Sequence, residues 1–139
     1  MPAPDFAHPL TVRLHHTDAA GVIFYSRLLE LAHEAYEALL EQAGLGIGKI
    51  LVQGEVRLPV VAVEAQFARP IRAGDRLQVE LTLTRSGDHS YQVAYRFRDP
   101  AGTEVARAAT RHVALDAIHG GPTALPEALG RIVDGTASG

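Results

Sequence analysis

The residues best suited to chemistry lie in one short segment near the start of the chain. Residues 15–25 read His-His-Thr-Asp-Ala-Ala-Gly-Val-Ile-Phe-Tyr, between a strand-like stretch and a helical one. The segment places the carboxylate of Asp18 and the flexible Gly21 close to a helix start, whose free N–H groups favour a developing negative charge. Such a carboxylate could act as a nucleophile or as a base toward water. The structural alternative is that Asp18 only caps the helix.

A long amphipathic helix is predicted directly after this segment, from about Ser26 to Ala43. Apolar side chains recur there at steps of three and four residues, and charged side chains fill the other face. Gly44 is placed to end the helix, because glycine readily adopts the backbone conformation found after helix C-termini. Residues 44–58 contain several glycines, and we expect no regular structure there.

Alternating apolar and polar residues predict strands on both sides of the helix. Leu10, Val12 and Leu14 indicate a first strand, preceded by loose residues 1–7. Short turns between the later strands favour antiparallel neighbours, and a sheet that curls around the helix is expected. Its free edges are natural places for self-association. The four later strands are predicted to begin near Val61, Leu77, Tyr91 and Val105.

Length and composition narrow the possible functions. The chain has 139 residues, which allows a single domain with a core of about residues 8–118 and a tail at 119–139. Its formal net charge of −3 leaves no excess of basic side chains to hold a nucleic-acid backbone, so no nucleic-acid partner is expected. It contains no cysteine, which excludes disulfides and cysteine nucleophiles. With no signal peptide and no apolar run near the ~20 residues that span a bilayer, we expect a cytoplasmic protein without a membrane partner.

Several motifs together resemble a known family. The run Asp-Ala-Ala-Gly-Val-Ile-Phe-Tyr at 18–25 and the run His-Glu-Ala-Tyr-Glu at 33–37 resemble the hotdog-fold thioesterases of the 4-hydroxybenzoyl-CoA thioesterase type. Arg-Pro-Ile-Arg-Ala-Gly-Asp at 69–75 and Thr-Arg-His-Val at 110–113 support the resemblance, which covers about residues 8–118. The motifs at 17–21 and 33–37 are most similar to those of the 1,4-dihydroxy-2-naphthoyl-CoA hydrolases of that family. It implies an α+β hotdog fold, in which a curved antiparallel five-stranded sheet wraps around one long helix.

The resemblance also implies roles for individual residues. Asp18 matches the catalytic carboxylate, and the backbone N–H of Tyr25 matches the donor that polarises the thioester carbonyl. Gly21 matches the glycine that lets the substrate approach the backbone. The family places the site between two subunits, with the acyl group against the helix start and the stretch from Val60 to Val63. The residues predicted to bind substrate are Thr17, Val22, Val60 and Val61.

Two positions depart from the family pattern. His16 stands where many relatives carry an acidic residue, so the hydrogen bonding of the loop can differ. The turn that often binds the CoA nucleotide keeps Arg85, His89 and Ser90 as candidate contacts, but Asp88 in the same turn would repel phosphate. An ordinary solvated hairpin turn is the alternative.

Other polar residues have simpler explanations. His15 and His16 beside Asp18 suggest a metal site, but adjacent residues of a strand point to opposite faces, so no metal is expected. The glutamates of the predicted helix are expected on its solvent-exposed face. Glu30 and Glu34 are minor rivals to Asp18, because a related subfamily carries its carboxylate on this helix. His33 is expected at the surface or at a subunit contact.

The predicted function is hydrolysis of an aromatic acyl-CoA to the acid and free CoA, with 1,4-dihydroxy-2-naphthoyl-CoA as the best substrate candidate and no cofactor. The chain is expected to form dimers that pair into tetramers. Three alternatives stay open: a thioesterase for short aliphatic acyl-CoAs or for proofreading a synthase, a non-catalytic acyl-ligand binder, and an isomerase of the cystatin-like fold. The last would be supported if the first strand lay outside the sheet.

Overall fold

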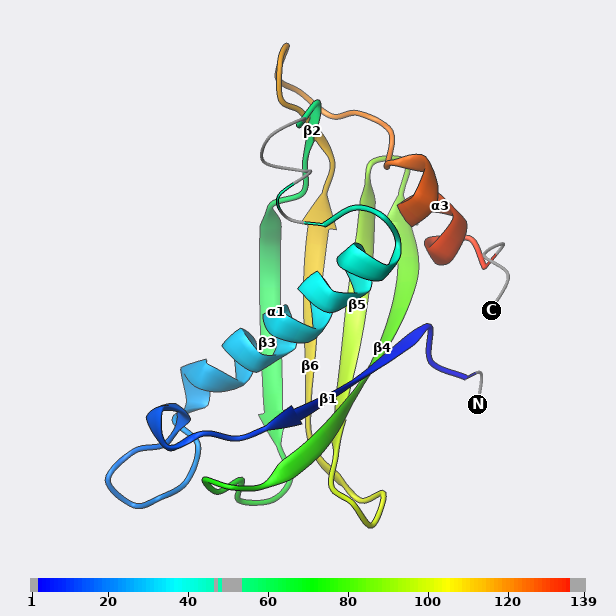
Figure 1. Ribbon diagram of the computed structural model, residues 1–139. Helices are drawn as coiled ribbons and strands as arrows, with labels where there is room; N and C mark the ends of the chain where they lie inside the picture. The colour runs from blue at the N-terminus through cyan, green and yellow to red at the C-terminus, as the bar shows by residue number, and fades with distance from the viewer. Residues whose placement is uncertain (1–2, 47, 49–53, 136–139) are drawn as a thin grey trace.

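The computed structural model describes residues 3–46, 48 and 54–135 (Figure 1). Part of the glycine-containing segment 44–58, namely residue 47 and residues 49–53, therefore lies outside the described residues. The elements in chain order are β1 (Phe6–Thr11), η1 (Leu14–His16), α1 (Tyr25–Gln42), β2 (Val56–Arg57), β3 (Val60–Phe67), β4 (Arg76–Gly87), β5 (Ser90–Arg98), β6 (Glu104–Val113), β7 (Leu115–Asp116) and α3 (Glu127–Val133).

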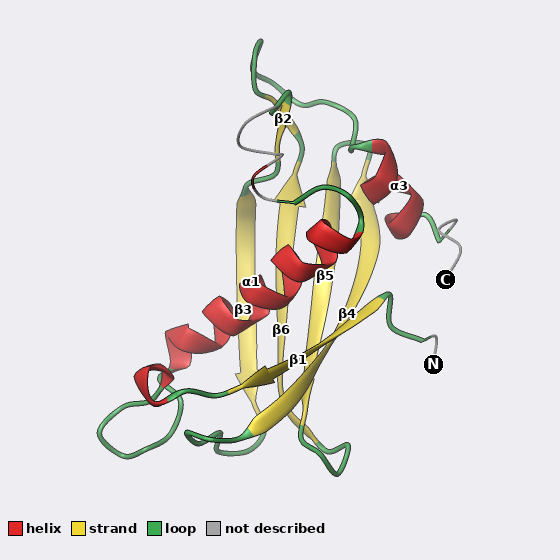
Figure 2. Cartoon of the chain, in the orientation of Figure 1, coloured by secondary structure: helices red, strands yellow, loops and turns green. Residues whose placement is uncertain are grey.

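Five strands form one twisted antiparallel sheet in the order β1-β4-β5-β6-β3. The helix α1 lies across one face of this sheet, and the strands curve around it (Figure 2). The short strands β2 and β7 pair separately with each other. The prediction of an α+β hotdog fold is confirmed. A first strand outside the sheet would have supported a cystatin-like fold. The first strand, β1, instead belongs to the sheet, because it pairs with β4.

The long helix forms where the sequence predicts it, at Tyr25–Gln42. Its end is a Schellman motif: the Leu45 N–H donates to the Leu40 carbonyl at 2.7 Å, and Gly44 has a φ of +79°. The role of Gly44 as the terminating residue is thus confirmed. The apolar stripe faces the sheet, and its buried members are Leu28, Leu31, Ala32, Ala35, Tyr36, Leu39 and Leu40.

The helix packs on the apolar faces of β4 and β5, where the strict alternation of the sequence is reproduced as strict alternation of burial. Each buried Leu, Val or Phe side chain of this kind stabilises the fold by roughly 1.5–3 kcal/mol relative to its exposed state. The buried residues of the two strands are Leu77, Val79, Leu81, Leu83, Tyr91, Val93, Tyr95 and Phe97.

The N-terminal prediction is wrong in its boundaries. β1 begins at Phe6, within the stretch expected to be loose, and ends at Thr11. Asp5 holds this start in place, because its N–H donates to the Leu81 carbonyl at 2.8 Å and its carboxylate accepts the Leu83 N–H at 2.7 Å. Leu14 is not part of a strand; it lies in the one-turn helix η1 and is 79% exposed.

The pairing of β3 differs from the expectation that strands adjacent in sequence pair with each other. β3 does not pair with β4, which follows it in sequence, but with β6 at the far edge of the sheet. The connection at 68–75 crosses the end of the sheet, and its eight residues easily span three strand spacings of about 4.8 Å. All eight residues of β3 are exposed. The strand therefore has partners on one side only and neither face covered.

A buried polar cluster joins α1 to the sheet. The His112 ring stacks on Tyr36 and Tyr91 at centroid distances of 4.7 and 4.9 Å, and the two tyrosine hydroxyls are hydrogen-bonded to each other. Burial raises the pKa of Tyr36 to about 12, so its hydroxyl stays protonated. In the described part of the chain, no buried side-chain nitrogen or oxygen lacks a hydrogen-bond partner.

The hydrogen bonds of this cluster fix the protonation of His112. A carbonyl can only accept, so His112 Nδ1–H donates to the Leu58 carbonyl at 3.3 Å. In the neutral ring Nε2 then accepts from the Thr110 hydroxyl at 2.9 Å, which in turn accepts from the Tyr95 hydroxyl at 2.9 Å. Burial lowers the pKa of His112 and keeps the ring neutral. His112 thereby ties β6 to Leu58, just before β3.

Candidate active site

The segment that carries Asp18 folds as a tight hairpin turn. The Gly21 N–H donates to the Asp18 carbonyl and the Asp18 N–H donates to the Val22 carbonyl, both at 3.0 Å. The Asp18 carboxylate accepts the Ala20 N–H at 2.8 Å, and Gly21 has a φ of +79°, which favours glycine. Asp18 is exposed, and no atom would lie within 4 Å of a Cβ added to Gly21. The turn thus presents an anchored carboxylate beside open space.

The same turn occurs a second time in the chain. At Asp99–Gly102, the Gly102 N–H donates to the Asp99 carbonyl at 2.9 Å, the Asp99 carboxylate accepts the Ala101 N–H at 3.0 Å, and Gly102 has a φ of +86°. An Asp-x-Ala-Gly turn is therefore a stable local structure in its own right. What distinguishes the turn at Asp18 is its place directly before α1.

The interpretation of Asp18 as a helix cap is wrong. Phe24 occupies the N-cap position of α1, and no side chain caps it. Tyr25 is the first residue of the helix, so its backbone N–H has no acceptor within the helix. The Phe24 and Tyr25 rings lie 4.8 Å apart and are 44% and 69% exposed. No acceptor for the Tyr25 N–H occurs among the described residues, so the helix start offers a free donor and two accessible aromatic rings.

Three extended segments hold the turn against the end of the sheet. Thr17 pairs with Ile23, and Val22 pairs with Arg72 of the connection at 68–75. The Ile23 N–H donates to the Ile71 carbonyl at 2.7 Å. The Thr17 hydroxyl donates to the Leu14 carbonyl at 2.7 Å. A cavity of about 390 Å³ opens between these segments, lined by Val22, Ile23, Phe67, Ala68, Arg69, Pro70 and Ile71.

His16 closes the base of this loop. Its backbone carbonyl accepts the Phe24 N–H at 2.9 Å, and its Nδ1 accepts the Arg13 N–H at 2.8 Å. Because Nδ1 is an acceptor, the neutral ring carries its proton on Nε2. Burial, with a smaller contribution from His15, lowers the pKa of His16. A neutral, hydrogen-bonded imidazole thus occupies the position at which the family resemblance implies an acidic residue.

The two neutral histidines predict how stability depends on pH. His16 and His112 both have pKa values below 6.5 in the folded chain, so the unfolded chain binds more protons near and below that pH. The contribution of these two histidines to the free energy of unfolding should therefore be fully present above about pH 6.5. The free energy of unfolding should fall as the pH drops below that value. Denaturant unfolding at pH 7.5, 6.5 and 5.5 measures this.

A His112→Asn variant keeps a donor for Leu58 and should lose stability at pH 7.5, yet show a weaker decline toward pH 5.5. His119→Gln changes an exposed histidine outside this cluster and serves as the control. A wild-type stability that rises on acidification from pH 6.5 to 5.5 would contradict the prediction.

Within one chain, the structure does not bring Val60 and Val61 to Asp18. The Phe67 end of β3 lies beside the loop, because Phe67 and Val22 line the same cavity. Val60 begins β3 and Phe67 ends it, so Val60 lies at the opposite end of the strand, seven residues or about 23 Å away. Figure 1 shows how β3 extends along the whole edge of the sheet. Val60 and Val61 are 42% and 55% exposed. A site that contains both groups therefore needs a second chain.

The candidate CoA contacts Arg85, His89 and Ser90 also lie at the far end of the sheet, beside α3 (Figure 1). Arg85 forms a two-pronged ion pair with Asp134, with N–O distances of 2.8 and 3.0 Å. This pair holds the pKa of the Asp134 carboxyl below its usual value. His89 is bonded to the Thr123 carbonyl at 2.9 Å and Ser90 to Ser86 at 3.1 Å. The structure gives each of the three an intramolecular partner.

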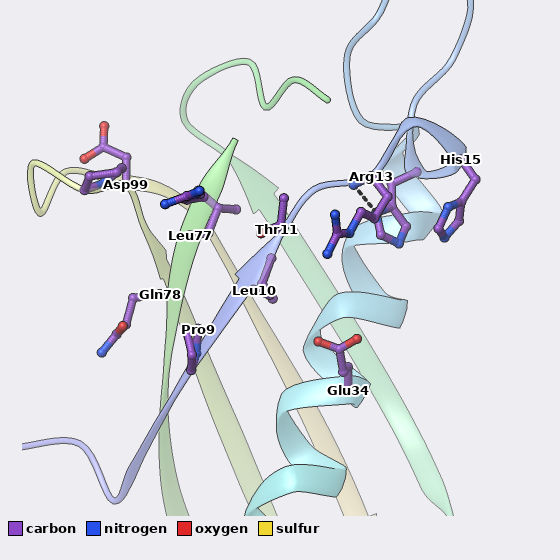
Figure 3. Close-up of a pocket in the computed structure, with 12 residues that line it drawn as sticks. Pro9, Leu10, Thr11, Arg13, His15, Glu34, Leu77, Gln78 and Asp99 are labelled. Carbon is purple, nitrogen blue, oxygen red and sulfur yellow. Dashed lines mark hydrogen bonds between the residues drawn. The ribbon is translucent and has the colours of Figure 1, made fainter. Parts of the chain in front are cut away.

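Another cavity, of about 680 Å³, lies between β1, the start of β4 and the first turns of α1. Figure 3 shows Glu34 of α1 and His15 of η1 on one side, facing Pro9 and Leu10 of β1. Glu34 bonds His8 Nε2 at 3.2 Å, and Glu30 pairs with Arg27 at 2.7 Å. His33 is exposed and pairs with Glu37.

His15 and His16 are not strand residues with side chains on opposite faces, as predicted: both lie in η1, and their ring centroids are 4.1 Å apart. The described residues contain no group of three or more His, Cys, Asp or Glu that could hold a metal ion. No helix in the described ranges is long and apolar enough to cross a membrane.

Comparison with known proteins identifies the family. The model of the Thioesterase-like superfamily matches residues 12–133. A 1,4-dihydroxy-2-naphthoyl-CoA hydrolase from Rippkaea orientalis is 39% identical over 121 residues, which cover 86% of this chain and 88% of that protein. A protein of the same name from Prochlorococcus marinus is 39% identical over 135 residues, 92% of this chain and 89% of its own.

Among solved structures, a 1,4-dihydroxy-2-naphthoyl-CoA thioesterase from Synechocystis superimposes with a TM-score of 0.86. It is 32% identical and covers 93% of this chain and 95% of its own length. The turn, the free helix start and these likenesses agree: the chain belongs to the Thioesterase-like superfamily.

Proposed function

We propose that this protein hydrolyses an aromatic acyl-CoA, with 1,4-dihydroxy-2-naphthoyl-CoA as the substrate, to the free acid and CoA. The observation that carries the proposal is the anchored, exposed carboxylate of Asp18, in a turn seven residues before the first N–H of α1, that of Tyr25. The substrate assignment rests on relatives of that name that are 38–39% identical to this chain. The exposed rings of Phe24 and Tyr25 suit a planar aromatic acyl group.

In the proposed reaction, the thioester carbonyl oxygen accepts a hydrogen bond from the Tyr25 N–H, which stabilises the negative charge that develops on it. The Asp18 carboxylate either attacks the carbonyl carbon, forming an acyl anhydride that water then hydrolyses, or takes a proton from the attacking water. In both routes the C–S bond breaks and the thiolate leaves as CoA. Both routes need the carboxylate ionised, and neither needs a metal or organic cofactor.

The working unit is proposed to be a dimer formed through β3. This strand is an unpaired edge, and its Val60, Val61, Val63 and Phe67 are among the most exposed large hydrophobic residues of the described chain. The opposite edge, β1, contains Pro9, which has no N–H to offer a further strand. No proline interrupts β3. The two edges therefore differ, and β3 is the one suited to pairing.

Antiparallel pairing of β3 with its copy explains why the site residues are separated in one chain. A two-fold axis across β3 brings the Val60 end of one strand beside the Phe67 end of the other. Val60 and Val61 of the partner subunit then lie near the Asp18 loop and can cover the acyl group. Further pairing of dimers into tetramers stays a prediction, as does a cytoplasmic location.

We also infer that residues 1–139 form one domain. Leu129 and Val133 of α3 lie in the segment predicted to be a tail, yet they are buried in the same cluster as the residues of α1, β4 and β5. The core thus extends beyond residue 118.

A panel of thioesters tests the substrate assignment. The purified protein is offered 1,4-dihydroxy-2-naphthoyl-CoA, benzoyl-CoA, acetyl-CoA and palmitoyl-CoA, and released CoA is measured with a thiol reagent. We expect kcat/KM to be highest for the two aryl esters, at least tenfold above the aliphatic ones, because the apolar pocket residues and the aromatic rings favour a flat acyl group. Higher kcat/KM for acetyl-CoA would favour the short-chain alternative, and binding without turnover would favour the non-catalytic one.

A further inference from the structure

In the part of the chain that the structure describes, four arginines at one end of the molecule have no ion-pair partner. Arg69 and Arg72 lie on the connection between β3 and β4, Arg76 begins β4, and Arg13 follows β1. All four are exposed, and within the described ranges none has a carboxylate oxygen within 4 Å of its guanidinium. This end of the molecule therefore carries unpaired positive charge, although the formal net charge of the chain is −3.

The acidic groups near these arginines are tied to the backbone. Asp75 accepts the Arg72 N–H at 2.8 Å, and Asp99 accepts the N–H groups of Ala101 and Thr103 at 3.0 and 2.9 Å. Neither carboxylate forms an ion pair in the described part of the chain. The segment 69–76 holds three arginines and one aspartate. Its outward side chains are therefore predominantly basic.

This basic segment is attached directly to the Asp18 loop. Arg72 pairs with Val22, and the Ile23 N–H donates to the Ile71 carbonyl. Asp18 pairs with Val22 in the turn, so Asp18 and Arg72 are about two strand spacings, or ~10 Å, apart. Arg69 lines the 390 Å³ cavity together with Val22, and also an adjoining cavity of about 450 Å³ that it shares with Arg76.

We propose that Arg69 and Arg72 bind the phosphate groups of the CoA moiety, an inference that rests on the proposed thioesterase function. The pantetheine arm is comparable in length to about four extended residues, ~14 Å, so phosphates attached to a thioester at Asp18 fall within reach of a long side chain ~10 Å away. Arginine suits this role because its planar guanidinium binds phosphate through two parallel N–H donors.

The hairpin at 85–90 is the weaker candidate for the same ligand. Arg85 is already neutralised by both oxygens of Asp134, and binding phosphate would require that pair to open. Asp88 adds a negative charge to the same turn. Arg69 and Arg72 form no such ion pair with any described residue, so phosphate binding would not require one to open.

The test compares two substrates that differ only in the phosphates: an aryl-CoA and the same acyl group on N-acetylcysteamine. For Arg69→Gln/Arg72→Gln we expect KM for the aryl-CoA to rise about tenfold or more, since each lost charged contact weakens binding. Values of kcat should stay close to wild type. Turnover of the N-acetylcysteamine ester should not change. KM of the wild type should rise with salt, and the variant should show a weaker rise.

Two further variants make the result specific. Arg96→Gln/Arg107→Gln removes two positive charges from the open face of the sheet, where both arginines lie beside Glu104, and should leave both KM values unchanged. Arg85→Gln tests the rival hairpin. The proposal is overturned if Arg85→Gln raises KM for the aryl-CoA while Arg69→Gln/Arg72→Gln does not, or if the latter impairs both substrates equally.

Titration of the wild type with CoA alone separates this proposal from the proposed function. CoA binding that is lost in Arg69→Gln/Arg72→Gln supports the phosphate site even if no aryl-CoA is hydrolysed. Hydrolysis with unchanged CoA affinity in that variant leaves the thioesterase function standing and removes the phosphate site.

Discussion

Replacing Asp18 with asparagine is expected to lower kcat for an aryl-CoA by ~10² to 10⁴, about 3 to 5 kcal/mol of barrier. Asparagine keeps the side-chain oxygen that accepts the Ala20 N–H, so the turn persists, but it removes the charge that both catalytic routes need. Stability should therefore change by no more than about 1 kcal/mol. Steady-state kinetics and thermal unfolding of the same preparation measure the two effects.

The chain supplies a matched control for this change. Asp99→Asn makes the same substitution in the same Asp-x-Ala-Gly turn, at a place that does not precede a helix. It should cost a similar amount of stability and leave kcat close to wild type. If Asp18→Asn retains near wild-type turnover, Asp18 is not the catalytic carboxylate, and Glu34 and Glu30 become the residues to change next.

The second large effect concerns the shared site. Val61→Trp places a bulky ring where the acyl group bound at the Asp18 loop of the partner subunit would lie, and we expect it to reduce activity at least tenfold. The substitution should not unfold the chain, because the Val61 side chain is 55% exposed. Mixing this variant with Asp18→Asn should restore activity. A mixed dimer has one site with both Asp18 and Val61 intact, so random exchange of subunits recovers about a quarter of the wild-type rate.

Before the variants are mixed, size-exclusion chromatography with light scattering checks that each one forms a dimer. If Val61→Trp does not form a dimer, Val60→Trp replaces it. Two dimeric, inactive variants that stay inactive after subunit exchange would show that each chain carries a complete site. A wild-type monomer at micromolar concentration would contradict the β3 dimer itself.

The parts of the fold that local sequence determines were predictable. The 3.6-residue period of α1, the glycine after it and the two-residue period of β4 and β5 each arise from neighbours in sequence, and the structure reproduces them. The Asp18 turn belongs to this group, because an aspartate followed three residues later by a glycine is itself a turn signal. The pattern itself indicated Asp18 as a nucleophile, a base or a helix cap, whereas the roles proposed for Gly21 and the Tyr25 N–H rest on family resemblance.

Features that depend on distant contacts were not predictable. Alternation identified β3 as a strand but could not show that it pairs with β6 or that neither face is covered, because exposure depends on which elements lie nearby. Leu14 continued an alternating pattern, yet the chain turns at η1 so that His16 can accept the Arg13 N–H. The place of Arg72 beside the Asp18 loop follows from one long-range pairing with Val22, which leaves no local signal.

The pairing of β3 with β6 has a consequence for how the chain folds. Val60 pairs with His112, 52 residues later, so β3 must wait until β6 has been made and placed. Contacts between such distant residues form late, because a long loop must close before they gain any energy. During that interval an apolar, proline-free strand is unpaired on both sides. Newly made chains at high concentration are therefore most at risk of misassembly through β3, and charged substitutions at Val63 should slow aggregation during refolding.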